Sequence, residues 1–106
     1  MNEQEIEQEL QDKGLDAPRL TPSLIDGKIV KKYYHIVPDT TLTICVLTLE
    51  NGYQVVGKSA SVSKDNFNKE IGEKIAFEDA REQIWNLEGY LLKDIEYKKA
   101  KYGIKE

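Results

Sequence analysis

The spacing of apolar residues changes along the chain, and the first segment has very few of them. Residues 3–13 are polar except for Ile6 and Leu10, which are one helical turn apart, and Gly14 follows as a stop signal. This pattern predicts a short helix with a weak apolar face. We expect it to lie in an acidic N-terminal arm that comprises residues 1–20.

A second short helix is predicted where the remaining chain, residues 21–106, begins a single folded domain. Thr21 can cap the helix with its side-chain oxygen, and Pro22 suits the first helical position. Gly27 then ends the helix.

Three β-favouring runs follow at residues 30–37, 41–49 and 53–59. Asn51 and Gly52 separate the last two runs and supply the positive φ angles of a tight hairpin turn. The order of runs and turns predicts a three-stranded antiparallel meander.

The middle strand is apolar on both faces, and Gly57 in the next strand marks a potential bulge. Alternation places Leu42, Ile44 and Val46 on one face and Cys45, Leu47 and Leu49 on the other. One helix can cover only one face of a sheet. We therefore expect a homo-oligomer, with a dimer as its smallest unit.

The C-terminal third has helical spacing. One row of apolar residues contains Phe67, Ile71 and Ile75, and an adjacent row contains Ala76, Ala80, Ile84 and Leu87. A bend is expected near residues 87–89, where Gly89 lies. The predicted fold class is α+β: a three-stranded antiparallel meander packed against a long or broken C-terminal helix, with short N-terminal helices.

Length, charge and composition exclude several classes of protein but do not identify a function. The chain has 106 residues and a net charge of −4, which suits one modest core and argues against a general nucleic-acid binder. Its longest apolar run, residues 42–49, is too short to span a membrane. The acidic start at residues 1–5 is unlike a secretory or transit peptide. Both charged ends are expected to be solvated: seven acids lie in residues 1–26, and five lysines lie in residues 93–106.

The residues that usually carry catalysis are scarce. Cys45 is the only cysteine, which excludes an internal disulfide and favours a reducing compartment, and it lies within an apolar strand. His35 is the only histidine, so one chain cannot build a zinc site from cysteine and histidine, and no second imidazole can act as a base. The acidic pair Glu78 and Glu82 has the spacing of a solvated helix face. We expect a binding protein without catalytic residues, metal or cofactor.

Aromatic and basic residues on the long helix are the best candidates for binding. Phe77 and Arg81 are four residues apart, so one helix face could stack a base and bind a phosphate. The alternative is that Phe77 packs against the core and Arg81 forms a surface pair with Glu78 or Glu82.

Two motifs resemble a family of small tailed-phage proteins that are mostly known by gene-product number. The first runs through residues 34–45 and 49–53, and the second comprises residues 84–92, including Trp85, Gly89 and Tyr90. Shorter matches include Asn66-Phe67, Gly72, Lys74-Ile75-Ala76 and Ala80-Arg81, so that the resemblance covers about residues 21–93. This family is in turn similar to phage proteins that defeat Thoeris-type bacterial immunity.

The resemblance implies a counter-defence protein of the host cytoplasm. Such a protein would sequester a cyclic ADP-ribose isomer, or a cyclic dinucleotide, without hydrolysing it. In this sequence Phe67 or Phe77 would stack the base, and Arg81, Lys93 or Lys98 would contact phosphate oxygens. Lysines must supply most of these contacts, because the chain has only two arginines, Arg19 and Arg81. The alternative is a small phage protein that inhibits a host enzyme by direct protein–protein binding.

Overall fold

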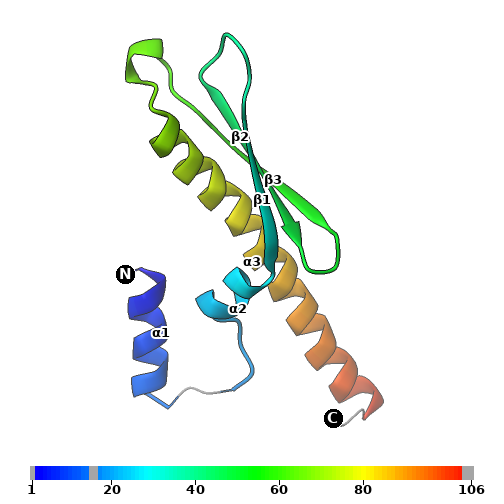
Figure 1. Ribbon diagram of the computed structural model, residues 1–106. Coiled ribbons are helices and arrows are strands. Elements are labelled where there is room, and N and C mark those ends of the chain that lie inside the picture. The colour runs from blue at the N-terminus through cyan, green and yellow to red at the C-terminus, as the bar shows by residue number, and fades with distance from the viewer. Residues whose placement is uncertain (1, 15–16, 104–106) are drawn as a thin grey trace.

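The computed structural model describes residues 2–14 and 17–103 and confirms the α+β fold class (Figure 1). Three antiparallel strands form one sheet in the order β1-β2-β3, and a long C-terminal helix packs along one side of it. In chain order the elements are α1 (Glu3–Asp12), α2 (Pro22–Gly27), β1 (Ile29–Ile36), β2 (Leu42–Leu49), β3 (Gln54–Ala60), the 3-10 turn η1 (Lys64–Asn66) and α3 (Lys69–Tyr102).

The short helices begin and end where the local sequence predicts. The side chain of Thr21 accepts a hydrogen bond from the backbone N–H of Leu24, which caps α2 immediately before Pro22. Asn2 caps α1 in the same way, and Gly14 adopts a positive φ of 65° after the helix. These capping signals involve neighbouring residues only, so the sequence suffices to find them.

The turn between β2 and β3 differs from the expected two-residue turn. Only Gly52 has a positive φ, and the backbone N–H of Leu49 donates to the carbonyl of Tyr53. The loop therefore has three residues, Glu50 to Gly52, and glycine at its last position avoids the strain of a left-handed conformation.

The core lies between α3 and one face of the sheet. Cys45, Leu47 and Leu49 of β2 are buried, together with Val55 of β3 and the α3 residues Ala76, Ala80 and Ile84. Leu42, Ile44 and Val46 point to the opposite face and are only partly buried. The two predicted faces of the central strand are therefore confirmed.

Gly57 allows the helix to approach the sheet closely. A Cβ atom at this position would lie 2.1 Å from the carbonyl oxygen of Ala76 and 2.3 Å from the backbone nitrogen of Ala80. Small residues on both elements thus bring β3 and α3 into backbone contact. The predicted bulge at Gly57 is wrong, because Cys45 pairs with Gly57 in a continuous register; the irregularity lies in β1, between Ile29 and Lys31.

α3 is one continuous helix of 34 residues, and the bend expected near Gly89 does not occur. At about 1.5 Å per residue such a helix is roughly 50 Å long, whereas strands of eight residues extend about 26 Å. The C-terminal half of α3 therefore extends beyond the sheet, α2 contacts α3, and α1 lies on the far side of α2 in this view (Figure 1). Within residues 2–14 and 17–103, no helix has both the length and the apolar character that crossing a membrane requires.

The close contact at Gly57 generates the first prediction. Gly57→Ala places a methyl group against the α3 backbone, which cannot move aside, so we expect a loss of about 3 kcal/mol in the free energy of unfolding. Gly27→Ala is the matched control, because a Cβ at Gly27 meets no atom within 4 Å. Thermal unfolding should show a melting point lower by roughly 15 °C for the first variant and unchanged or slightly higher for the second. Equal melting points would contradict the contact.

Candidate functional site

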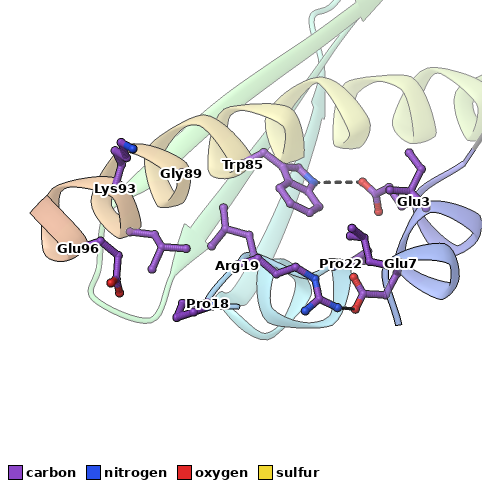
Figure 2. Close-up of a pocket in the computed structure, with 13 residues that line it drawn as sticks. Glu3, Glu7, Pro18, Arg19, Pro22, Trp85, Gly89, Lys93 and Glu96 are labelled. Atoms are coloured by element: carbon purple, nitrogen blue, oxygen red, sulfur yellow. Dashed lines mark hydrogen bonds and ion pairs between the residues drawn. The ribbon is translucent and has the colours of Figure 1, made fainter. Parts of the chain in front are cut away.

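A large cavity lies between α1, the linker before α2 and the C-terminal half of α3 (Figure 2). It has a volume of about 700 Å³, within the range of small-molecule sites in proteins. Most of the lining residues are apolar, with charged side chains among them. They are Glu3, Ile6, Glu7 and Leu10 of α1, Pro18, Arg19, Leu20 and Pro22, and Trp85, Gly89, Leu92, Lys93 and Glu96 of α3.

The spacing of the lining residues along α1 and α3 places them on the helix faces that border the cavity. Trp85, Gly89 and Leu92 follow one another at four and three residues, so they share one face of α3. Ile6 and Leu10 form the facing stripe of α1. Gly89 leaves room between the two walls, since even a Cβ atom there would lie 3.9 Å from the nearest methyl group of Leu20.

Arg81 connects the elements at one end of the cavity. Its Nε donates to Asp26 Oδ1 of α2 at 2.8 Å, and its Nη1 donates to Glu3 Oε1 of α1 at 2.5 Å. Nη2 also lies 3.5 Å from the carbonyl oxygen of Pro22. The residue is only 6% exposed. Hydrogen bonds from the guanidinium to Glu3, and then to Asp26, raise the pKa of Arg81, so it carries its charge at every pH of interest.

Glu3 contacts α3 through a second hydrogen bond. Trp85 Nε1 donates to the same Oε1 atom at 3.1 Å (Figure 2). The hydrogen bond from Arg81 lowers the pKa of Glu3 from its ordinary value of 4.5, and the bond from Trp85 acts in the same direction. We call Glu3, Asp26, Arg81 and Trp85 the Arg81 cluster; it joins α1, α2 and α3 at one end of the cavity.

An ion pair between Arg19 and Glu7 joins the linker to α1. Arg19 Nε is buried and has no hydrogen-bond partner among the described residues, so this guanidinium retains one donor for an additional acceptor. At the other end Glu96 pairs with Lys99, whereas Lys93 is exposed and forms no ion pair within the described part of the chain. Lys93 is thus the lining cation whose charge is not already balanced.

The structure does not bring the predicted binding residues together. Phe67 lies before α3, beside a small cavity of about 90 Å³ at the opposite end of the sheet. Phe77 packs against the core, and Lys32 Nζ lies 4.7 Å from the centre of its ring. Lys98 forms an ion pair with Asp94 of the same helix. Of the five candidates, Lys93 alone lines the large cavity.

The alternative of a surface ion pair between Arg81 and Glu78 or Glu82 is wrong. Arg81 is buried, and its partners are Glu3 and Asp26. The helical repeat correctly placed Phe77 and Arg81 on one face, but that face points toward the protein.

Sequence reasoning missed Trp85 as the aromatic residue of the cavity. The available signal was the spacing of Trp85, Gly89 and Leu92 on one helix face, together with Ile6 and Leu10 in the arm. That signal could not show that the two stripes face each other, because the residues that join them lie about 80 positions apart.

Replacing Arg81 tests whether it is structural. Arg81→Ala leaves the carboxylates of Glu3 and Asp26 without their buried partner, and we expect a loss of about 2 kcal/mol in unfolding free energy. Lys98→Ala, which removes an ion pair of an exposed lysine on the same helix, should leave the unfolding free energy nearly unchanged. Chemical denaturation measures both values. An Arg81 variant as stable as the Lys98 variant would rule out the structural role.

The lowered pKa of Glu3 predicts a dependence on pH. Ionised Glu3 stabilises the fold, so its contribution is complete above pH 4.5, the pKa of the unfolded state, and is lost as the pH falls through the lower folded pKa. Trp85 is the only tryptophan, and its fluorescence should shift to longer wavelength as α1 detaches below pH 4.5. Glu3→Gln carries no charge to lose and should lack this transition. Identical titrations of the two proteins would contradict the assignment.

Comparison with known proteins identifies a family over most of the fold. Residues 20–95 match the model of the phage protein (N4 Gp49/phage Sf6 gene 66) family, a range that includes α2, the whole sheet and most of α3. No curated protein and no solved structure matches the chain. Because the match covers well over half of its residues, the chain belongs to the phage protein (N4 Gp49/phage Sf6 gene 66) family.

Proposed function

We propose that this phage protein binds a small molecule in the cavity between α1 and α3 and sequesters it without converting it. The proposal rests on the cavity of about 700 Å³, which combines apolar walls with the Trp85 indole and with Lys93, a lysine that has no ion-pair partner among the described residues. An apolar enclosure with a few polar groups is the usual form of a small-molecule site.

The proposed ligand is a cyclic nucleotide that serves as an immune signal, namely a cyclic ADP-ribose isomer, with a cyclic dinucleotide as the second choice. The resemblance to phage proteins that defeat Thoeris immunity supports this class. Trp85 replaces Phe77 as the residue that would stack a base, and Lys93 would contact a phosphate oxygen. Arg19 Nε–H offers a further donor once the ligand has entered.

The environment of the nucleophilic side chains supports binding rather than catalysis. Cys45 is completely buried, and this burial raises the pKa of its thiol, which keeps it protonated and unreactive. His35 lies on the face of the sheet opposite α3, away from the residues that line the cavity. Neither group can reach a ligand bound between α1 and α3.

Calorimetric titration with cyclic ADP-ribose isomers and cyclic dinucleotides tests the proposal, with linear ADP-ribose as the ligand control. We expect binding of a cyclic compound and its recovery intact, by mass spectrometry, after the protein is denatured by heat. Lys93→Ala should weaken binding about tenfold, because one charge-assisted contact is lost. Lys69→Ala, an exposed lysine at the far end of α3, is the matched control.

Gly89→Leu provides a second variant that suits the helix and fills the cavity. It should abolish binding while the melting point stays the same or rises. If no cyclic nucleotide binds, or if Lys93→Ala and Gly89→Leu bind as the wild type does, the proposal fails. The inhibition of a host enzyme by protein–protein contact would then be the remaining candidate.

A further inference from the structure

The face of the sheet opposite α3 has no covering element within the described residues. α3 contacts β2 and β3 from one side only, and Figure 1 shows no helix over the other side. Strand register defines which side chains point outward. They are Lys31, Tyr33 and His35 of β1, Leu42, Ile44, Val46 and Thr48 of β2, and Gln54, Val56, Lys58 and Ala60 of β3, which together we call the open face.

The centre of the open face is apolar. A solvated sheet face normally carries polar side chains, yet β2 directs Leu42, Ile44 and Val46 outward. Val46 pairs with Tyr33 on one side and Val56 on the other, and these two are 55% and 52% exposed. A continuous apolar row thus crosses all three strands.

The open face has lysine and histidine side chains but no carboxylate among its strand residues. Lys31 and Lys58 are exposed, and His35 lies in the same cross-strand row as Lys58, with Ile44 between them. No strand residue of this face is acidic, although the chain has 19 aspartate and glutamate residues. The surface therefore favours a partner that brings carboxylates as well as apolar side chains.

We expect a binding partner to pack on the open face rather than to add a fourth strand beside β3. Two backbone groups at the outer edge of β3 are already occupied: Asp79 accepts from the N–H of Lys58, and Gln83 donates to the carbonyl of Val56. Three strands of this length present a face of roughly 14 Å by 23 Å, which matches one helix of about 15 residues.

We propose that the open face docks an acidic amphipathic helix of another protein. Its apolar stripe would lie on Tyr33, Val46 and Val56, and its flanking carboxylates would approach Lys31 and Lys58. The strand residues of a second open face, placed against the first, would bring no carboxylate to these lysines, so a second copy fits the charges less well. A single-stranded nucleic acid fits the lysines but not the aliphatic centre.

Synthetic peptides test the proposal on the full-length protein. The probe is a helical peptide of 15 residues with leucine at positions i, i+3, i+4 and i+7 and glutamate flanking the stripe. Its control has lysine in place of glutamate. We expect the acidic peptide to bind with micromolar affinity, as suits so small a contact, and the basic peptide to bind at least tenfold more weakly. NMR shift changes should include Tyr33, Val46 and Val56.

The double variant Lys31→Glu/Lys58→Glu should weaken binding of the acidic peptide at least tenfold, whereas Lys64→Glu/Lys69→Glu, away from the face, should leave it unchanged. Both pairs are exposed, so folding is preserved. Equal binding of the two peptides, or shifts confined to other surfaces, would overturn the proposal. Tighter binding of an oligothymidine would also overturn it, because the face would then belong to a nucleic acid. A dimer in light scattering that the double variant dissociates would assign the face to a second copy.

Discussion

The buried guanidinium of Arg81 joins three helices, α1, α2 and α3, which share few other contacts. α2 is held to the core by Ile25, which is completely buried, whereas α1 has no buried residue and cannot be fixed by its own apolar surface. A charge enclosed by protein must be paired, and Arg81 meets this requirement with Glu3 and Asp26. The position of α1, and with it one wall of the large cavity, depends on that pairing.

A second constraint is the difference in length between α3 and the sheet. Gly57 fixes the helix against β3 at Ala76 and Ala80, so the first half of α3 fills one face of the sheet and the second half extends beyond it. In the extending half Leu92 lines the large cavity, and Trp85, which also packs against the core, lies beside it. The same arrangement leaves the other side of the sheet uncovered, because residues 2–14 and 17–103 contain no second long helix. One packing contact thus accounts for both candidate binding surfaces.

Local signals in the sequence sufficed for most of the fold. Caps at Thr21 and the glycine stops involve residues within one turn, and the alternation in β2 shows directly which residues share a face. The sequence left open whether α3 is continuous or broken near Gly89, and the structure shows one continuous helix. A single glycine costs about 1 kcal/mol in a helix, which is less than the loss of the hydrogen bonds on both sides of a break.

The site could not be predicted because its residues come from opposite ends of the chain. Glu3 and Arg81 are 78 positions apart, and nothing in the local pattern indicates that a polar arm returns to α3. The same holds for Gly57, whose contact with Ala76 depends on how helix and sheet pack. Lys93 was identified from its charge alone, and the structure adds that it lies at the cavity.

A double-mutant cycle between Glu3 and Arg81 tests most directly whether this pair joins α1 to α3. The unfolding free energies of Glu3→Gln, Arg81→Met and the double variant give the coupling energy between the two side chains. We expect a coupling of about 1 kcal/mol or more, because each single variant leaves the other group without its partner. Single effects that add to within about 0.3 kcal/mol would show that α1 is not held by Arg81, and the cavity would lose one of its walls.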